Sequence, residues 1–204
     1  MKTSRFFAVL LVILFIGFAG GCYVPGRIQG NGNVINQERS IRGFNGIVLN
    51  GAAIVNVHQS DGYRVTVRTD SNLQNMIETK VNNNLLQIGI NLTRAINTGF
   101  NPTELTIDIY MPELTEISVN GAGNITIADG KASSLRIALN GAATIDAQNY
   151  EVDSVSVNLS GAGDVKIWAV SGLDYQISGV GTVRYRGNPT LSGRTNGLGR
   201  VNRL

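Results

Sequence analysis

The sequence has few of the residues from which most active sites are built. Its 204 residues include one cysteine, one histidine and one tryptophan, and charged residues make up only 15% of the chain. A single cysteine excludes an intramolecular disulfide, and a single histidine, His58, leaves little for Ser-His-Asp or Cys-His catalysis. There is also no G-x-S-x-G nucleophile elbow and no D-x-D-x-D calcium loop. The sequence therefore predicts a non-enzymatic protein with no cofactor, no catalytic residues and no metal site.

Neither basic nor acidic residues are in large excess. The formal net charge is +3, and the residues after position 21 carry 15 basic and 14 acidic side chains. Because such a chain has no strong electrostatic field, we expect no nucleic-acid partner. Valine, isoleucine and leucine are plentiful, which favours a folded chain over a disordered one.

The amino terminus has the order of a secretory signal peptide. Lys2 and Arg5 precede an apolar run at 6–18, and small residues at 19–21 precede Cys22. The alternative, a transmembrane helix, needs about 20 apolar residues, more than the uncharged stretch supplies. We therefore expect residues 1–21 to be a signal peptide, cleaved between Gly21 and Cys22.

The segment Ala-Gly-Gly-Cys at 19–22 resembles the lipobox of bacterial lipoproteins. The resemblance implies that Cys22 becomes the lipidated first residue, which would hold the protein on a membrane without a spanning helix. Residues 22–40 contain Pro25, Gly26, Gly30 and Gly32, a composition that predicts a flexible tether.

A short signature recurs along the rest of the chain. A small polar residue followed by glycine occurs six times, and the last five copies lie 20, 20, 18 and 18 residues apart. A fixed period of this length is typical of repeat architectures, in which each unit packs on its neighbours. The glycines of the signature are predicted structural corner residues: Gly51, Gly121, Gly141, Gly161, Gly179 and Gly197.

Equivalent positions of the copies share their chemistry. Apolar residues alternate with polar ones, as in strands with one buried face. Glycine permits a tight corner with φ > 0, and the polar residue before it could form a hydrogen-bonded ladder between copies. We prefer a parallel β-solenoid with coils of 18–20 residues over an antiparallel sandwich or barrel, because only stacked units need identical corners. One column is entirely β-branched: Val55, Ile125, Ile145, Val165, Val183 and Val201.

Residues 59–112 break the period. Three segments within them alternate cleanly, at 63–69, 86–92 and 105–111, and predict longer, irregular strands before the regular coils. Residues 73–78 predict a short helical turn. No Pro/Ser-rich linker interrupts residues 41–204, so we expect one β-solenoid domain there.

Several phrases together resemble a known family. They are Arg-Gly-Phe-Asn-Gly-Ile at 42–47, the repeated Asn/Ser-Gly-Ala-Gly units, and Gly-Asn-Pro at 187–189. Over residues 40–204 the chain is similar to the auto-transporter adhesin, head GIN domain family. The resemblance implies a right-handed parallel β-helix in a cell-envelope protein, frequently a lipoprotein.

These observations favour a lipid-anchored, non-catalytic module for adhesion or ligand binding at the outer membrane, with a glycan or an envelope protein as ligand. Two alternatives stay open. One is an envelope scaffold or sensor that binds other envelope proteins, and the other is a polysaccharide-active enzyme, because solenoid folds host all three functions.

Exposed aromatic side chains are the best candidates for a binding surface. Trp168 and Tyr150 lie outside the apolar columns, and such rings can stack on sugars or seat a protein. Carboxylates of an enzyme would come from Asp146 and Asp164. Lys166 and Arg184 also stand in water-facing positions, so these acids could equally form surface ion pairs.

Overall fold

The computed structural model describes residues 28–91 and 99–204, which form an all-β structure with one short 3-10 helix, η1 (Gln74–Met76). This helix lies where a helical turn was expected. The predicted signal peptide, its cleavage site at Gly21 and the lipidation site at Cys22 lie outside the described residues. Within the described ranges, no helix has the length and hydropathy that crossing a membrane requires.

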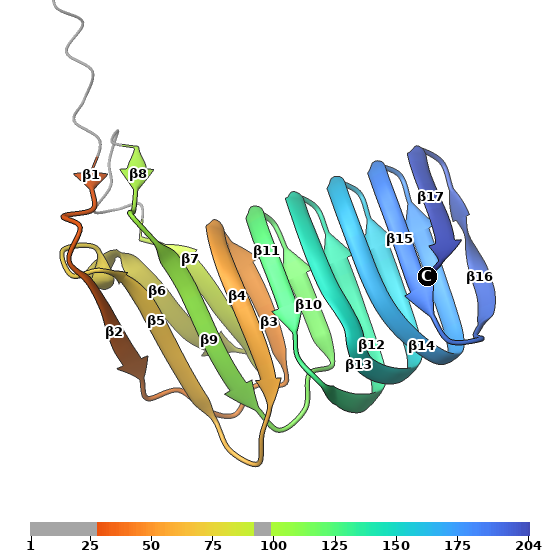
Figure 1. Cartoon of the computed structure of the whole chain (residues 1–204), viewed down its shortest axis with the longest axis horizontal. Helices are drawn as coiled ribbons and strands as arrows, with labels where there is room; N and C mark the ends of the chain where they lie inside the picture. Colours follow the sequence, from red (N-terminus) through yellow and green to blue (C-terminus); the bar gives the residue numbers. More distant parts are fainter. Residues whose placement is uncertain (1–27, 92–98) are drawn as a thin grey trace, which may run out of the picture.

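The described residues contain seventeen strands, and all of them except β1 and β8 join one sheet. Figure 1 shows them as a row of stacked turns, with the carboxyl terminus at one end. The strands are β1 (Ile28–Gln29), β2 (Val34–Arg39), β3 (Gly46–Asn50), β4 (Ala52–Gln59), β5 (Arg64–Asp70), β6 (Ile77–Asn82), β7 (Leu85–Ile90), β8 (Phe100–Asn101), β9 (Leu105–Met111), β10 (Glu116–Val119), β11 (Ala122–Ile127), β12 (Gly130–Leu139), β13 (Ala142–Leu159), β14 (Ala162–Ile177), β15 (Val180–Arg186), β16 (Thr190–Thr195) and β17 (Leu198–Arg203).

The regular part consists of two rows of parallel strands. The first row contains β4, β11, the first halves of β13 and β14, β15 and β17. The second row contains β3, β10, β12, the second halves of β13 and β14, and β16. Because every pairing within these rows is parallel, the antiparallel alternative does not describe this part of the chain.

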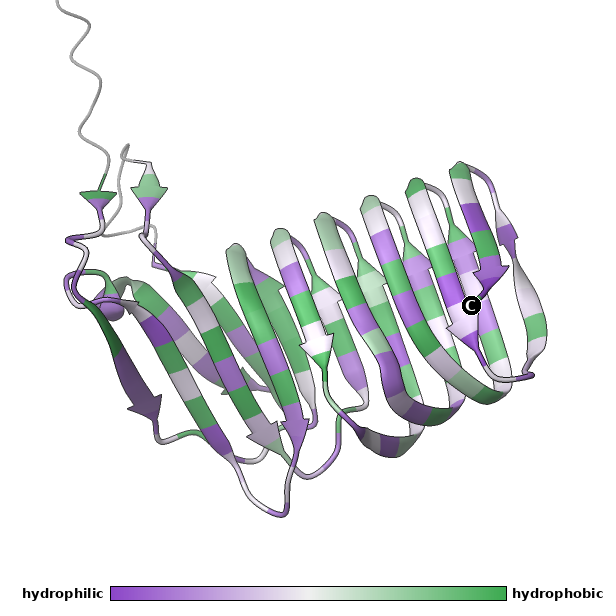
Figure 2. Ribbon diagram, viewed as in Figure 1, coloured by the Kyte–Doolittle hydropathy of each residue, from purple (hydrophilic) through white to green (hydrophobic). Residues whose placement is uncertain are grey.

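The register of the rows follows the columns of the sequence. Ile125 pairs with Ile145, Ile145 with Val165, and Val165 with Val183, so equivalent positions of successive copies lie side by side. Side chains of this column are buried, while their neighbours along the strands face outward. Figure 2 shows the resulting stripes of hydrophobic and hydrophilic residues along each strand. The alternation therefore places one shared apolar core between the two rows.

The amino-terminal end is built differently. β9 continues the first row and β7 the second, but β5 pairs antiparallel with β9, β2 with β5, and β6 with β7. The expectation of longer strands in this region is wrong, because β5, β6, β7 and β9 have six or seven residues. The longest strands, β13 and β14, have 18 and 16 residues because each bends from the first row into the second.

The prediction of a flexible tether is also wrong for part of its range. Residues 34–39 form β2, whose backbone pairs with β5 along its whole length. Most of its side chains are exposed, so the strand is held by main-chain hydrogen bonds rather than by a buried face. An apolar pattern could not reveal such a strand.

The six signature glycines lie between a second-row strand and the first-row strand that follows it; we call this side of the molecule the glycine edge. The explanation by φ > 0 is wrong for them, since the positive-φ glycines are other residues. The steric reason is a close approach: a Cβ on Gly161 would overlap the carbonyl oxygen of Gly141, and one on Gly141 that of Gly121. Gly51 is an exception, with only the Ile90 side chain nearby.

The polar residues before these glycines form a partial ladder. Asn120 Nδ2 donates to Asn50 Oδ1 at 2.9 Å, and Asn140 Nδ2 donates to Asn120 Oδ1 at 3.1 Å. The ladder ends where serine replaces asparagine, because the Ser160 hydroxyl instead donates to Asn158 Oδ1, two residues earlier in the chain. Stacked amides thus link three successive copies at the glycine edge.

Candidate functional site

β13 and β14 bend from the first row into the second on the side opposite the glycine edge. We call this side of the molecule the bend edge, and it carries a column of side chains. Lys131 pairs with Glu151, Glu151 with Trp168, and Trp168 with Arg186. These four residues, the Trp168 column, come from β12, β13, β14 and β15. Parallel pairing therefore brings one residue from each of four strands onto the same line.

A register shift creates this line. Between Ala147 and Glu151 the pairing of β13 with β14 is irregular, so that Glu151 lies beside Trp168 rather than beside a residue 20 positions on. A bulge of this kind bends a strand and redirects its side chains, and bulges are frequent at functional surfaces. The bend thus turns a large aromatic side chain toward the outside of the molecule.

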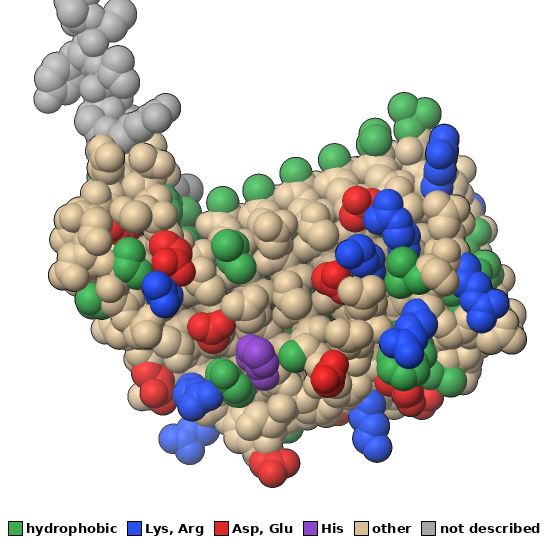
Figure 3. Space-filling model, in the orientation of Figure 1, with side chains coloured by type: hydrophobic (Ala, Val, Ile, Leu, Met, Phe, Trp, Pro, Cys, Tyr) green, Lys and Arg blue, Asp and Glu red, His purple; other side chains and the backbone are tan. Residues whose placement is uncertain are grey.

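Two neighbouring hollows of about 500 and 520 Å³ lie along this edge. Gln59, Lys131 and Glu151 line both of them, and Trp168 and Arg186 line one end. Acidic groups outnumber basic ones in the lining, which also contains Glu113, Asp129 and Asp153. In Figure 3, an apolar patch at the lower right of the molecule has basic side chains above it and acidic side chains below it.

The ring of Trp168 is half-buried and carries a cation on one face. The Cζ atom of Arg186 lies 4.2 Å from the ring centroid, and Arg186 itself is exposed. An exposed cation–π contact of this kind contributes only about 0.5–1 kcal/mol, so the guanidinium can be displaced at small cost. Trp168 therefore lies partly exposed at the bend edge, and its role in binding stays a prediction.

Gln59 lines both hollows and links separate parts of the chain by hydrogen bonds. Its Nε2 donates to the carbonyl oxygens of Pro112 and Lys131, at 2.8 and 3.1 Å, and its Oε1 accepts from the Lys131 N–H at 2.8 Å. The side chain therefore ties β4 to β12 and to the loop before β10. No sequence signal marked Gln59, because its partners are main-chain groups 53 and 72 residues away.

Tyr150 does not belong to the surface, and the expectation that it does is wrong. Its side chain is 1% exposed, and its hydroxyl accepts a hydrogen bond from the Leu114 N–H at 3.1 Å. Burial raises the pKa of this phenol, and the charge of Glu113 acts in the same direction. The residue points inward because the same irregular segment of β13 that exposes its neighbours turns this ring into the core.

Two ion pairs join charged residues of β13, β14 and β15 on the outside of the first row. Lys166 Nζ lies 3.1 Å from Asp146 Oδ2, and Arg184 Nη1 lies 3.4 Å from Asp164 Oδ1. Each carboxylate thus has a cation from the next copy as its partner. This pairing is the surface ion-pair alternative that the sequence left open, and it leaves no free pair of acids at these positions.

The single histidine, His58, stacks on a tyrosine that also contacts an arginine. The ring of His58 stacks on Tyr110 with centroids 4.7 Å apart, and the guanidinium of Arg64 lies 3.9 Å from the centroid of the Tyr110 ring. Among the described residues, no three His, Cys, Asp or Glu side chains are close enough together to hold a metal ion.

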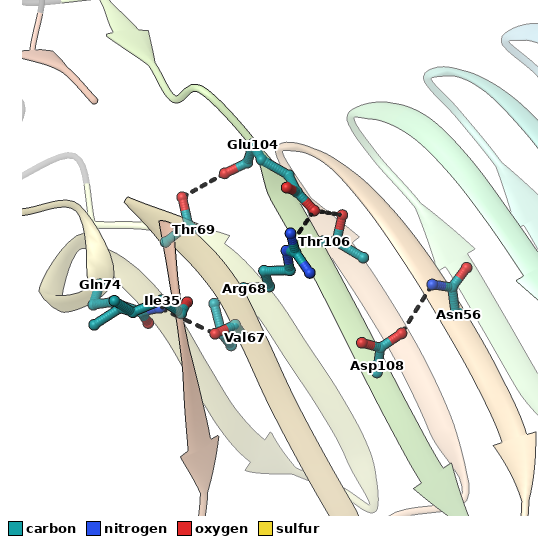
Figure 4. Close-up of polar contacts among 9 residues, drawn as sticks. All are labelled: Ile35, Asn56, Val67, Arg68, Thr69, Gln74, Glu104, Thr106 and Asp108. Atoms are coloured by element: carbon teal, nitrogen blue, oxygen red, sulfur yellow. Dashed lines mark hydrogen bonds and ion pairs between the residues drawn. The ribbon is translucent and has the colours of Figure 1, made fainter. Parts of the chain in front are cut away.

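Polar contacts at the amino-terminal end hold strands together. Figure 4 shows Asn56 Nδ2 donating to Asp108 Oδ1, and Arg68 paired with Glu104 at 3.0 Å. Gln74 Nε2 donates to the carbonyl oxygens of Ile35 and Val67, both at 3.0 Å, and so joins β2 to β5. These groups satisfy one another, which indicates a structural role.

A third hollow, of about 460 Å³, crosses the outer surface of the second row. Small hydroxyl side chains such as Ser134, Ser154 and Ser192 line it, together with Arg136 and Asp174. It lacks an aromatic side chain, so the bend edge, with Trp168, is the stronger candidate for a binding site.

A family model described as "Putative auto-transporter adhesin, head GIN domain" matches residues 43–129 and 121–189. The chain belongs to this family. No curated protein gives a significant match. The two overlapping matches of the head GIN model cover most of the two rows and both ends of the Trp168 column.

Solved structures from two bacterial species have a similar fold. One is a "putative adhesin" from Bacteroides fragilis, with 21% identity, a TM-score of 0.59, and coverage of 87% of this chain and 100% of that chain. Another is a "putative lipid binding protein" from Parabacteroides distasonis, with 21% identity, a TM-score of 0.50, and coverage of 87% and 99%. At this identity the likeness shows a shared fold. Membership of an adhesin family indicates a protein of the cell envelope or surface.

Proposed function

We propose that this head GIN protein is a non-catalytic binding module of the bacterial cell envelope, and that its bend edge binds a neutral glycan. The observation that carries the proposal is the Trp168 column, with its two hollows. Adhesion through this edge is the corresponding role in the cell.

The chemistry of the edge suits a sugar chain. Sugar rings present C–H groups that pack on an indole face, and hydroxyls that hydrogen-bond to carboxylate, amide and ammonium groups. Trp168 supplies the indole, while Glu151, Lys131 and Asn149 supply polar groups around it. The excess of acidic groups in the lining favours a neutral over an anionic glycan, since like charges repel.

The architecture supports such a role. The proposal includes a right-handed parallel β-helix, in which each coil runs through one second-row and one first-row strand. In-register parallel pairing of equivalent positions supports this description. A rigid stack of strands fixes the spacing of side chains along an edge, so that a linear ligand meets several strands at once.

An array of neutral oligosaccharides tests the binding site. We expect the purified protein to be retained by at least one β-linked hexasaccharide, and Trp168→Ala to lose that retention. Val180→Ala is the matched control, because Val180 is exposed but lies at the glycine edge. Retention that survives Trp168→Ala, or that is lost equally in Val180→Ala, would overturn the assignment of the site.

The proposal also includes attachment through a lipid on Cys22. The expected position of Cys22 after a signal peptide supports it. Cys22→Ala should move the protein from the membrane fraction to the soluble fraction, and continued membrane association would contradict lipid anchoring. Protease shaving of intact cells then distinguishes the sides of the membrane, since release of peptides from residues 120–204 requires exposure at the cell surface.

A further inference from the structure

The two ends of the paired rows differ. At the amino-terminal end, the antiparallel strands β2, β5 and β6 cover the rows. At the other end, β17 pairs only with β15 and β16 only with β14, and the described residues place no strand beyond them. Repeat proteins usually cover such ends, because an open strand edge can pair with another chain. Within residues 28–91 and 99–204, the strands at the carboxyl-terminal end therefore have an open edge.

The open edge has main-chain groups available for pairing. Asn196 is the residue directly after β16. Its N–H points toward β14 and donates to the Ile177 carbonyl oxygen at 2.7 Å. Main-chain groups of a strand point alternately to its two sides. The N–H and C=O groups of Leu191, Gly193 and Thr195 therefore face away from β14, where an added strand would lie.

The core is also incomplete at this end. Leu135, Val155 and Leu173 form an inward column in which each side chain is at most 3% exposed. Leu191 continues that column in β16 but is 44% exposed. One further strand would cover it, as each earlier strand covers the one before. An uncovered core position favours a polypeptide strand over a glycan or a lipid surface as the occupant.

Charge indicates what kind of polypeptide fits. Residues 175–204 contain five arginines and neither aspartate nor glutamate. Arg194, Arg200 and Arg203 are exposed on the last two strands, and no ion pair is found for them among the described residues. Two copies meeting end to end would oppose these arginines, so a second copy fits poorly.

We propose that the open edge of β16 docks an extended, acidic segment of another polypeptide, which adds as a strand. Its main chain pairs with Leu191, Gly193 and Thr195, an apolar side chain covers Leu191, and an acidic side chain faces Arg194. This inference is independent of the glycan site, which lies on the bend edge. It identifies a protein-binding surface separate from the Trp168 column.

Synthetic octapeptides with blocked ends test the proposal on the purified protein. We expect an alternating Glu/Val peptide to bind in calorimetric titration, at least about tenfold more tightly than its Lys/Val and Gln/Val counterparts. Arg194→Glu should weaken Glu/Val binding about tenfold, whereas Lys80→Glu, at the opposite end of the molecule, should leave it unchanged.

A second pair of variants separates main-chain pairing from charge. Thr195→Pro removes an outward N–H and keeps every charge, and a proline is tolerated at an outward position of an edge strand. We expect it to abolish peptide binding with an unchanged circular dichroism spectrum, while Thr195→Val binds as the parent does. Equal binding of all three peptides, full binding by Thr195→Pro, or dimerisation in sedimentation that replaces peptide binding would overturn the proposal.

Discussion

The guanidinium of Arg186 lies over the indole of Trp168, with Cζ 4.2 Å from the ring centroid. The two residues pair directly in neighbouring strands, so the contact follows from the register of β14 with β15. A ligand that stacks on this face of the ring must move the guanidinium aside. Arg186 thus acts as a removable cover on the proposed glycan site.

Removing that cover should change binding more than folding. For Arg186→Ala we expect unfolding free energy to fall by no more than about 1 kcal/mol, and affinity for a neutral hexasaccharide to rise up to fivefold. Urea unfolding and calorimetric titration measure the two effects. Arg203→Ala, which removes an exposed arginine at the carboxyl-terminal edge, is the control and should leave the affinity unchanged. A loss of affinity in Arg186→Ala would mean that the cation itself binds the ligand.

Gly161 tests the steric account of the glycine edge. Any side chain at this position overlaps the Gly141 carbonyl oxygen, so Gly161→Val should cost about 3 kcal/mol or more, or prevent folding altogether. Gly62→Ala is the control, because nothing lies within 4 Å of an added Cβ there. Chemical unfolding and soluble yield measure both variants. A folded Gly161→Val protein of normal stability would refute the close approach of the stacked corners.

The regular columns could be predicted from the sequence because each strand repeats its predecessor. Ile125, Ile145 and Val165 occupy equivalent positions, and their pairing follows directly from the period. The side chains of the bend edge could not be predicted in the same way. Glu151 and Trp168 lie 17 positions apart, because residues of the bulge in β13 have no partner in β14. The repeat in the sequence does not indicate where this bulge occurs.

The same bulge explains why Tyr150 and Trp168, which looked alike in the sequence, separate in the structure. Both lie outside the repeated columns, but one ring turns into the core and the other toward the surface. The strand β2 was missed for a different reason. Its stability depends on main-chain pairing with β5, which leaves no periodic apolar signal in its side chains.

Tyr150 makes a buried hydrogen bond through its hydroxyl group, which the substitution Tyr150→Phe deletes. Tyr150→Phe leaves the Leu114 N–H without its partner, and we expect a loss of about 1–3 kcal/mol in urea unfolding at pH 7. Because the folded pKa is raised above 10.0, the neutral phenol contributes stability below that pH and loses it as the pH rises further. The parent should therefore lose stability above pH 10 more steeply than Tyr150→Phe.

Tyr63→Phe is the matched control, since Tyr63 is 39% exposed. It should keep both the stability of the parent at pH 7 and its alkaline decline. If Tyr150→Phe declines with pH as steeply as this control does, the buried phenol is not the group responsible.

We expect the protonation of Asp70 to make the free energy of unfolding fall at acid pH. Burial alone would raise the pKa of this carboxyl, but hydrogen bonds from the Thr103 N–H, the Thr103 hydroxyl and the Gly32 N–H outweigh it and lower the pKa below 3.8. The ionised form therefore contributes stability above pH 3.8, and that contribution is lost as the pH falls through the lower, folded-state pKa.

Urea unfolding between pH 7 and pH 2.5 measures this contribution. Asp70→Asn should be less stable than the parent at pH 7, and the difference should shrink as the pH falls. Asp61→Asn, a change in an exposed turn, should follow the parent throughout. A constant gap between Asp70→Asn and the parent at every pH would show that ionisation of Asp70 does not stabilise the fold.

The most direct test of the proposed function uses the intrinsic fluorescence of Trp168. The chain has one tryptophan, so every change in indole emission reports on the bend edge. During titration with a β-linked neutral hexasaccharide that retains the protein on an array, we expect a saturable blue shift of the Trp168 emission, because a sugar ring replaces water beside the indole. Saturable binding by calorimetry with no change in the Trp168 emission would contradict it, because the glycan would then bind elsewhere.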